Sequence, residues 1–410
     1  MPRRFTDIPK FFATVTVAIA LGSFVTSADA DTINADSCSR FDVQEAVDAA
    51  VDGDTVVVPA GSCTWSDPLT VTHKGITIRG AGVDETIITD ATEKAYAESA
   101  IAVLASSGDL FRITGFTFNG TAGSEGLIGI RGSSQAWRID NNKFDLASGR
   151  PIAIKGHTYG VIDHNTIEKK TAMIWVATDG FGDSSWSTPI ALGSPNAVYI
   201  EDNVFDQTRH HLGAADAQAG GRFVFRYNTL RDSYVHMHGS ETGYPERGGV
   251  CYEIYGNNFI HTENWFAAIF LRGGTGVAYD NTATGYQNMI NVINRRSYES
   301  HGDWGRCDGS SSYDGNEDSN GYPCYDQFGR GPNQSSAPFH EWENYLDGEN
   351  ADVYVQSVST QHIQEDRDYF NDTQLPGYTP YTYPHPLTTV EDEAPPTVPN
   401  PPANLRIVSG

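Results

Sequence analysis

The chain has 410 residues, of which 39% are apolar and 19% charged, so it is long enough to bury a core and too apolar for general disorder. It carries 27 Lys and Arg against 52 Asp and Glu, a formal net charge of −25. That charge would repel a nucleic acid, and an acidic ligand would need a local group of cations or a bridging cation. The 41 glycines and 4 methionines are typical of a turn-rich β protein.

Residues 1–30 have the pattern of an export signal. Arg3, Arg4 and Lys10 precede an apolar stretch over 11–25, and Ala28-Asp29-Ala30 is a cleavage site of the small-x-small type. The apolar stretch is too short to anchor the chain in a bilayer, and no later segment is long enough. We therefore expect a secreted protein, extracellular or periplasmic, with no membrane contact after cleavage. Cleavage leaves 24 basic and 50 acidic residues, a net charge of −26.

Five cysteines remain in an oxidising compartment. Cys38 and Cys63 flank the first structural unit, and Cys307 and Cys324 bracket a polar loop, so each pair is expected to form a disulfide. Cys251 lies in an apolar run and is expected to be a buried free thiol. No spacing of cysteine or histidine indicates a zinc or haem site.

The central region repeats a short motif that closes on an asparagine. The closing residues are separated by 23, 23, 38, 25, 30 and 23 positions and are Asn119, Asn142, Asn165, Asn203, Asn228, Asn258 and Asn281. A base period of 23 with occasional insertions indicates a solenoid, and the runs between the turns are too short for helices. We expect an all-β parallel β-helix with three short strands in each coil and coils stacked about 4.8 Å apart. The asparagines are expected to adopt the left-handed backbone of a turn and to form a hydrogen-bonded ladder.

The ends of such a solenoid need caps. Residues 41–51 have one apolar face and are expected to form a short N-terminal capping helix. The β-helix domain is expected over 31–390, with a disulfide-closed loop inserted at 299–339 and a covering segment at 366–387. Residues 391–410 are typical of a Pro-rich linker followed by the start of a truncated module.

Two further segments, “DGDTVVVPAG” at 52–61 and “ITIRGAG” at 76–82, accompany the capping helix and the asparagine repeat. Together they resemble the secreted members of the pectate-lyase-like right-handed parallel β-helix superfamily, over about residues 36–300. The resemblance implies the fold, whereas the superfamily holds lyases, hydrolases and binding proteins. The “RxPxxR” pattern of pectate lyases is absent, since Arg150-Pro151 has no matching second Arg. The strand that ends in Lys155 resembles the catalytic-lysine strand of β-helix alginate lyases and of chondroitinase B.

The resemblance also sets a register, because the asparagine turn of this superfamily follows the second strand of each coil. The first strands are then expected at 127–132, 151–156, 189–193, 212–216, 234–239 and 268–273. Strand alternation predicts one outward column made of Arg131, Lys155, Gly193, His238 and Arg272. It predicts a second outward column of mostly small residues, which are Gly129, Ala153, Ala191, Gly213, His236 and Phe270.

A column of cations on one sheet face needs a reason, because like charges placed opposite each other destabilise a sheet. An acidic, uronate-containing polysaccharide lying along the solenoid axis provides that reason, and cleavage by β-elimination is the expected reaction. In that reaction a base removes the C5 proton, a cation neutralises the adjacent carboxylate, and the C4–O4 bond breaks.

His238 is the first candidate for the base, with Arg272 binding the carboxylate, because imidazole titrates near neutral pH. Lys155 is the rival base, with Arg131 as its neutralising partner, and the sequence leaves this choice open. A long turn over 240–249 is expected to overhang the cleft.

Further candidates come from the turn and from neighbouring coils. Tyr244 is a candidate acid for the leaving oxygen, and Arg247 is a candidate ligand for a carboxylate or sulfate. The expected substrate contacts are Arg131, His236, His211, Asp216 and, from an insertion over 169–189, Trp186. The sequence assigns no cofactor. A Ca²⁺ ion is an alternative neutralising group, with Asp216 and Glu241 as its candidate ligands.

Two other functions fit parts of the pattern. A non-catalytic glycan-binding or adhesin solenoid would have a shallow groove lined by aromatic side chains. A hydrolase of the polygalacturonase type would need two or three clustered carboxylates, and Asp216 with Asp179 and Asp183 are the available ones. We predict a secreted, monomeric polysaccharide lyase that acts on an acidic polysaccharide.

Overall fold

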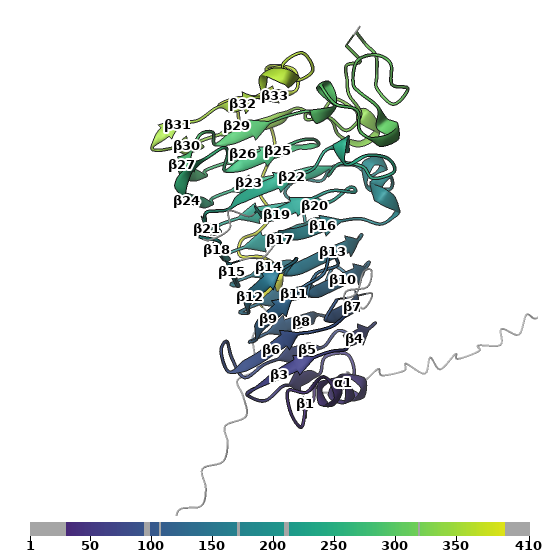
Figure 1. The fold of residues 1–410 in the computed structure, drawn as a ribbon, viewed down its shortest axis with the longest axis vertical. Coiled ribbons are helices and arrows are strands. Elements are labelled where there is room, and N and C mark those ends of the chain that lie inside the picture. Colours follow the sequence, from purple (N-terminus) through teal and green to yellow (C-terminus); the bar gives the residue numbers. More distant parts are fainter. Residues whose placement is uncertain are drawn as a thin grey trace, which may run out of the picture.

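The computed structural model describes residues 30–93, 99–105, 108–169, 173–208, 213–318 and 320–389. Within these ranges the chain winds as a parallel β-helix with three long sheets, which confirms the predicted fold class (Figure 1). Each complete coil contributes one strand to each sheet, so sequential coils stack along one axis. The expected signal peptide (1–30, of which only residue 30 is described) and the linker after residue 390 lie outside the described residues.

Sheet A has 12 strands in the described ranges. In stacking order they are β1 (Thr32–Asn34), β2 (Thr55–Val57), β5 (Thr77–Arg79), β8 (Phe111–Thr114), β11 (Trp137–Asp140), β14 (Val161–Asp163), β17 (Val198–Glu201), β20 (Arg222–Arg226), β23 (Cys251–Tyr255), β26 (Thr275–Tyr279), β29 (Phe339–Trp342) and β33 (Tyr369–Phe370).

Sheet B has 11 strands in the same ranges. They are β3 (Gly61–Trp65), β6 (Thr86–Asp90), β9 (Thr117–Thr121), β12 (Lys143–Ser148), β15 (Thr166–Lys169), β18 (Val204–Asp206), β21 (Thr229–Arg231), β24 (Asn258–Trp265), β27 (Thr282–Tyr286), β30 (Tyr345–Leu346) and β31 (Glu349–Asn350). Its last pair, β30 and β31, is antiparallel.

Sheet C has 10 strands in the described part of the chain and carries the candidate site. They are β4 (Leu69–Thr72), β7 (Ile101–Ala105), β10 (Ile128–Gly132), β13 (Ile152–Gly156), β16 (Ile174–Ala177), β19 (Gly213–Ala217), β22 (Tyr234–Met237), β25 (Ile269–Leu271), β28 (Ile290–Val292) and β32 (Val353–Val355). The neighbours of the outward residues point inward from this sheet and are fully buried, and they include Ile130, Ile154, Met237 and Leu271.

The N-terminal cap is the helix α1 (Arg40–Ala49), which confirms the predicted capping helix. The side chain of Ser39 accepts a hydrogen bond from the backbone of Asp42, so it satisfies one of the free N–H groups of the first turn. Val43, Ala46 and Val47 are buried against the first coils. The cap is tied to them by the predicted disulfide between Cys38 and Cys63, and the second predicted disulfide, Cys307–Cys324, is also present. Cys251 is a buried free thiol, as expected.

The asparagine ladder exists, and two of its predicted members are wrong. Its members are Asn142, Asn165, Asn203, Asn228, Asn257, Asn281 and Asn344, and each of the first six donates its backbone N–H and its side-chain N–H to the Oδ1 atom of the next. Asn258 is exposed at the start of β24, and Asn119 lies inside β9, so neither belongs to the ladder. The positive φ falls on the residue before each ladder asparagine, as at Asn141 and Asp202. The side-chain amide of each ladder asparagine can therefore hydrogen-bond to the neighbouring coils.

The expected strand at 189–193 is also wrong. Its place in sheet C is taken by β16, and 189–193 belongs to the loop that follows. The insertion in this coil therefore comes after the sheet C strand, and Ala177 pairs with Lys155 where Gly193 was expected. Trp175 lies on the strand and not in the insertion.

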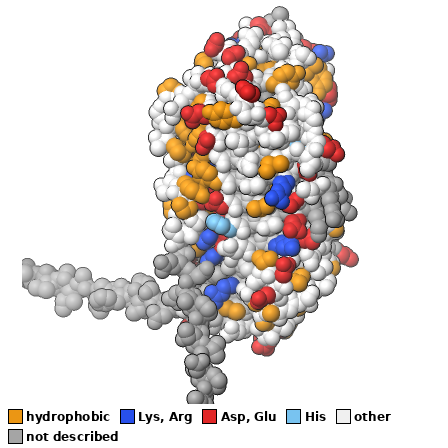
Figure 2. All heavy atoms as spheres, turned by 90° about the vertical axis from the view of Figure 1, so that its left-hand side faces the viewer, with side chains coloured by type: hydrophobic (Ala, Val, Ile, Leu, Met, Phe, Trp, Pro, Cys, Tyr) orange, Lys and Arg blue, Asp and Glu red, His pale blue; other side chains and the backbone are white. Residues whose placement is uncertain are grey.

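Figure 2 views the molecule from the side on which sheet B lies in Figure 1. Acidic side chains gather toward the upper end of this face, and below them Lys, Arg and further acidic side chains are scattered among neutral ones. Among the described residues, no helix is both long enough and apolar enough to cross a bilayer.

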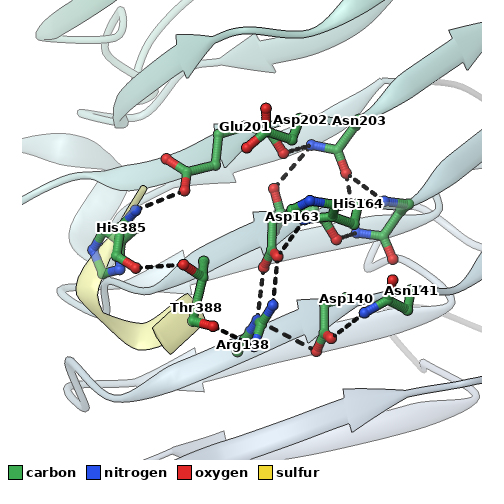
Figure 3. A network of polar contacts seen from close by, with 12 residues as sticks. Arg138, Asp140, Asn141, Asp163, His164, Glu201, Asp202, Asn203, His385 and Thr388 are labelled. Atoms are coloured by element: carbon green, nitrogen blue, oxygen red, sulfur yellow. Dashed lines mark hydrogen bonds and ion pairs between the residues drawn. The ribbon is translucent and has the colours of Figure 1, made fainter. Parts of the chain in front are cut away.

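The C-terminal strap, residues 378–389, lies along the outward face of sheet A (Figure 3). Buried ion pairs cross that face between coils, including Arg138 with Asp163 and Arg226 with Glu201. The strap caps these pairs with backbone groups. The His385 N–H donates to Glu201, and the carbonyls of Thr388 and Thr382 accept from the two arginines. The covering segment expected at 366–387 overlaps this strap.

Candidate active site

The four basic residues predicted to share one face lie in one column of sheet C, in two pairs. Arg131 is directly opposite Lys155 on β10 and β13, and the pairing of β22 with β25 places His238 beside Arg272. The coils of β16 and β19 separate the two pairs. Three strand steps of about 4.8 Å put Lys155 and His238 roughly 14 Å apart along the axis. The column is thus arranged as two cationic positions with neutral side chains between them.

The second outward column differs from the prediction in its middle. Trp175 pairs with Ala153 on one side and with Asp216 on the other, and Asp216 pairs with His236, which pairs with Phe270. Ala191 and Gly213 are absent from it. A β-bulge between Gly213 and Ala215 shifts the register by one residue and brings Asp216 into line. The predicted column of small residues therefore ends at Ala153, and the next positions along it hold aromatic, acidic and imidazole side chains.

Asp216, His236 and His238 form the centre of the candidate site. Asp216 comes from β19, and His236 and His238 share one face because they are two residues apart at the end of β22. Nδ1 of His238 lies 2.7 Å from Oδ1 of Asp216, and Nδ1 of His236 lies 3.5 Å from the same oxygen. The Asp216 side chain is 4% exposed and that of His238 is 20% exposed. The buried carboxylate thus holds an imidazole that reaches the surface.

The charges of this cluster favour an ionised Asp216. Burial alone would raise the pKa of its carboxyl group, but the neighbouring His236, His238 and Arg272 outweigh burial and lower the pKa to about 2. Burial lowers the pKa of His236 well below its ordinary value, and this effect exceeds the opposing influence of Asp216. The cluster therefore presents a carboxylate and a neutral buried imidazole.

Arg272 is buried next to His238 and is held by Glu241. Its Nη1 lies 2.6 Å from Oε1 of Glu241, which belongs to the short 3-10 turn η3 (Ser240–Thr242) directly after β22. The hydroxyl of Ser240 anchors that turn by donating to the carbonyl of Tyr325. The two carboxylates expected to bind Ca²⁺ thus have protein partners, Asp216 with His238 and Glu241 with Arg272.

The other cationic pair is held by Glu125. This carboxylate makes a hydrogen-bonded ion pair with Arg131, and its Oε1 lies 3.9 Å from Nζ of Lys155. The ring of Trp175 lies nearby, with Lys155 5.9 Å and Arg150 4.5 Å from its centroid. Sequence reasoning missed Arg150 as a site residue. Arg150 precedes β13 in a turn, and strand alternation does not predict which way a side chain in a turn points.

The turn over 240–249 packs against the insertion that follows β16. Arg247 pairs with the buried Asp326 and is stacked between the rings of Trp186 and Tyr325. Trp186 is 1% exposed, and its indole N–H donates to the carbonyl of Gly248. Neither side chain is free for the substrate contact expected of it. The buried ion pair of Arg247 with Asp326 instead holds the turn over 240–249 in place.

Of two other predicted residues, one packs on the loop that contains Trp304 and the other lies outside the described residues. Tyr244 is 54% exposed, and its ring packs edge-on against Trp304. His211 lies in 209–212, outside the described residues.

Two hollows lie along sheet C, one on each side of the cluster and separated from it by at least one strand. One, of about 390 Å³, is lined by residues of β4, β7 and β10, including Leu104, Gly129 and Arg131. The other, of about 500 Å³, is lined by side chains that include Phe266, Asn291 and Tyr354. Because both lie on the outward face of one sheet, an extended ligand placed along the axis would cross the His238 cluster between them.

No family model matches the sequence, and no curated protein sequence matches it. Among solved structures, an alginate lyase from Paenibacillus sp. strain FPU-7 has a TM-score of 0.41 at 17% identity, covering 62% of this chain and 95% of its own. A PL6 family polysaccharide lyase from Pseudopedobacter saltans has a TM-score of 0.38 at 12% identity, covering 79% and 76%. The catalytic domain of a GH87 alpha-1,3-glucanase has a TM-score of 0.35 at 11% identity, covering 84% and 68%. These similarities are too distant for site residues to be transferred between the chains.

Proposed function

We propose that the protein is an exported polysaccharide lyase that cleaves an acidic, uronate-containing chain by β-elimination on the outward face of sheet C. The single observation that carries this proposal is the hydrogen bond between Nδ1 of His238 and the buried carboxylate of Asp216. A carboxylate in that position makes Nδ1 the protonated nitrogen and leaves the lone pair on Nε2. An imidazole with this orientation, partly exposed and beside a buried arginine, is suited to act as a base next to a group that binds an anion.

In the proposed step Nε2 of His238 removes the C5 proton of a uronate. The electron pair of the C5–H bond forms the C4–C5 double bond, and the C4–O4 bond breaks with its electrons on the leaving oxygen, which takes a proton from water. Arg272, beside His238, stabilises the negative charge that develops on the C6 carboxylate. Glu241 holds Arg272 in place, so the guanidinium does not have to be ordered during the reaction.

Arg131 and Lys155 supply a second anion-binding position on the same face. Their distance from His238 of roughly 14 Å along the axis suits another carboxylate of one bound chain. We assign Lys155 to substrate binding, because it shares Glu125 with Arg131 whereas His238 has its own buried carboxylate. Lys155→Ala is then expected to raise KM and to leave most of kcat.

The test is a panel of acidic polysaccharides, namely alginate, pectate, glucuronan, ulvan and glycosaminoglycans. The new double bond absorbs in the ultraviolet, so lyase action gives rising absorbance together with new reducing ends. We expect wild-type protein to produce both signals on one of these substrates, and His238→Ala to produce neither while it stays folded. His157→Ala is the matched control, since His157 is an exposed histidine bonded to Ser184 and lies outside the cluster.

Three results would overturn the proposal. New reducing ends without absorbance would show a hydrolase, and retention of an acidic polysaccharide without any product would show a binding protein. Full lyase activity of folded His238→Ala would remove His238 as the base.

A further inference from the structure

We propose that Asp216, His236 and His238 form a binding site for a divalent transition-metal ion, and that zinc is the ion their donor atoms fit best. The site stands on the arrangement of the three side chains and does not require the protein to be a lyase. Its effect on catalysis, described below, rests on the proposed function.

The geometry of two adjacent strands brings the three ligands together. His236 and His238 alternate by two along β22 and so project from the same face, and Asp216 is directly opposite His236 on β19. One nitrogen of each ring and one oxygen of Asp216 all lie within 4.8 Å of one another. Ligand atoms at about 2.0–2.2 Å from one zinc ion lie at most about 4.4 Å apart, so small side-chain rotations would bring the three onto one ion.

His236 is the observation that points to a ligand. Within the described part of the chain, neither of its ring nitrogens has a hydrogen-bond partner, although both atoms are buried. Buried polar groups are normally satisfied, and an unsatisfied one calls for an explanation such as an ion. The side chain is 7% exposed, and its Nδ1 faces Oδ1 of Asp216 at 3.5 Å. A metal ion bound between them would satisfy a nitrogen that protein groups leave unpaired.

The surroundings fix the ligands in place. The ring of His236 is stacked on Phe270, with centroids 5.2 Å apart and an angle of 15° between the planes. His238 is the most exposed of the three ligands, so a fourth coordination position would open toward the outward face of sheet C. Three protein ligands with one open position are typical of zinc sites that bind a water or a substrate group.

The donor set discriminates between metals. Two imidazoles and one carboxylate suit zinc and its transition-metal neighbours, whereas Ca²⁺ and Mg²⁺ prefer oxygen ligands alone. The Ca²⁺ site considered from the sequence used Asp216 with Glu241, and Glu241 is paired with Arg272. The structure therefore favours zinc bound by Asp216, His236 and His238 over Ca²⁺ bound by Asp216 and Glu241.

Metal binding and the proposed base are mutually exclusive. An ion that takes the lone pair of His238 Nδ1 leaves the ring hydrogen on Nε2, which then has no lone pair to accept the C5 proton. Zinc is therefore expected to inhibit the proposed lyase by occupying its base.

The test uses the mature chain without a polyhistidine tag, treated with a chelator and titrated with Zn²⁺ by calorimetry. We expect one zinc ion per chain and no Ca²⁺ binding at these residues. His236→Phe keeps a ring of similar size on Phe270 and removes both nitrogens. We expect it to weaken zinc binding at least about 100-fold, since loss of an outer-shell partner alone costs about 10–100-fold. Its melting temperature without metal should stay close to that of wild type, which shows that the variant folds.

A second readout is the visible spectrum of the Co²⁺-loaded protein, whose d–d bands report coordination by nitrogen and oxygen. These bands should disappear in His236→Phe and persist in Asp372→Asn. That variant is the control, because Asp372 is exposed and forms another carboxylate group with Glu341 and Asp352.

The outcomes separate the two proposals. Absence of zinc binding to wild type, unchanged binding to folded His236→Phe, or loss of binding in Asp372→Asn would each overturn the metal site. Zinc binding at the three residues in a protein without lyase activity on any acidic polysaccharide would support the metal site and overturn the proposed function alone. If zinc binds there and raises lyase turnover, the assignment of His238 as base is overturned.

Discussion

The carboxylate of Asp216 and the imidazole of His238 come from successive coils and meet at 2.7 Å, with the carboxylate buried and the imidazole partly exposed. Asp216→Asn should therefore lower kcat about 100-fold or more and change KM little. The reason is that an asparagine amide can donate to Nδ1 and so leave the hydrogen on Nε2, the nitrogen proposed as the base. Steady-state kinetics on the substrate found in the polysaccharide panel measures both constants.

Asp206→Asn is the control for this variant, since Asp206 is a surface residue paired loosely with Arg231 on sheet B. An Asp216→Asn enzyme with wild-type kcat would mean that the carboxylate does not orient the base.

The ion pair between Arg272 and Glu241 predicts a loss of stability. Both side chains are almost fully buried, so Glu241→Gln removes the ion-pair partner of a guanidinium in the interior. We expect the free energy of unfolding to fall by about 3 kcal/mol, because removing one partner of a buried pair is strongly destabilising. Denaturant unfolding followed by circular dichroism measures this change.

The exposed pair of Arg231 with Asp206 gives the comparison. Asp206→Asn should change the free energy of unfolding by at most about 1 kcal/mol, since exposed pairs contribute little. Equal losses in Glu241→Gln and Asp206→Asn would show that burial of the Arg272 pair has no energetic consequence.

The corrected asparagine ladder makes a third prediction. Asn203 donates to the carbonyls of Ile162 and Glu201, accepts a hydrogen bond from Asn165 and donates one to Asn228. Asn203→Ala leaves buried backbone groups unpaired, each costing about 1–3 kcal/mol, so we expect a total loss of about 3 kcal/mol.

Asn119→Ala is the matched control, because the sequence repeat places Asn119 in the ladder and the structure places it in β9. We expect its effect to stay within about 0.5 kcal/mol, as for surface substitutions. If the two alanine variants lose the same stability in thermal unfolding, the ladder contributes nothing specific.

The sequence predicts the solenoid because period and alternation are local properties. The 23-residue period, the amphipathic cap and the disulfide pairs follow from local pattern and spacing. Alternation, in the register that the resemblance to the β-helix superfamily implies, placed Arg131 beside Lys155 and His238 beside Arg272. The predictions that failed are those that depend on where extra residues are inserted into a coil. The bulge at Ala214 realigns Asp216, and the place of the insertion relative to β16 decides that Ala177, not Gly193, follows Lys155.

The composition of the site was harder to predict than its face. Sequence reasoning treated Asp216 and His236 as separate substrate contacts, because their proximity arises only after the bulge is counted. It found no metal-ligand spacing, since a His-x-His pair on a strand becomes a three-ligand cluster only with a carboxylate from the next strand. The opposite error affected Arg247 and Trp186, whose residue types suit a substrate but whose side chains pack against each other in the interior.

The last prediction concerns the pH dependence of stability and comes from His385 in the strap. The His385 imidazole is buried between the strap and sheet A, near Arg226, Arg138 and Asp163, with the rings of Tyr199 and Tyr381 against it. Burial, reinforced by the neighbouring arginines, lowers its pKa to about 4. The unfolded chain, with an ordinary pKa of about 6.5, therefore binds a proton more readily than the folded protein does. The stabilising contribution is complete above about pH 6.5 and is lost as the pH falls toward 4.

The shift from about 6.5 to about 4 corresponds to about 3 kcal/mol at 1.36 kcal/mol for each pH unit. We expect His385→Gln to remove this part of the pH dependence, so that the difference in unfolding free energy between wild type and variant shrinks between pH 6.5 and pH 4. His164→Gln should show the opposite sign, because the hydrogen bond with Asp163 raises the pKa of His164 and its contribution is lost as the pH rises. Unfolding curves at several pH values measure both, and a difference for His385→Gln that does not vary with pH would mean that its imidazole is not buried in the folded strap.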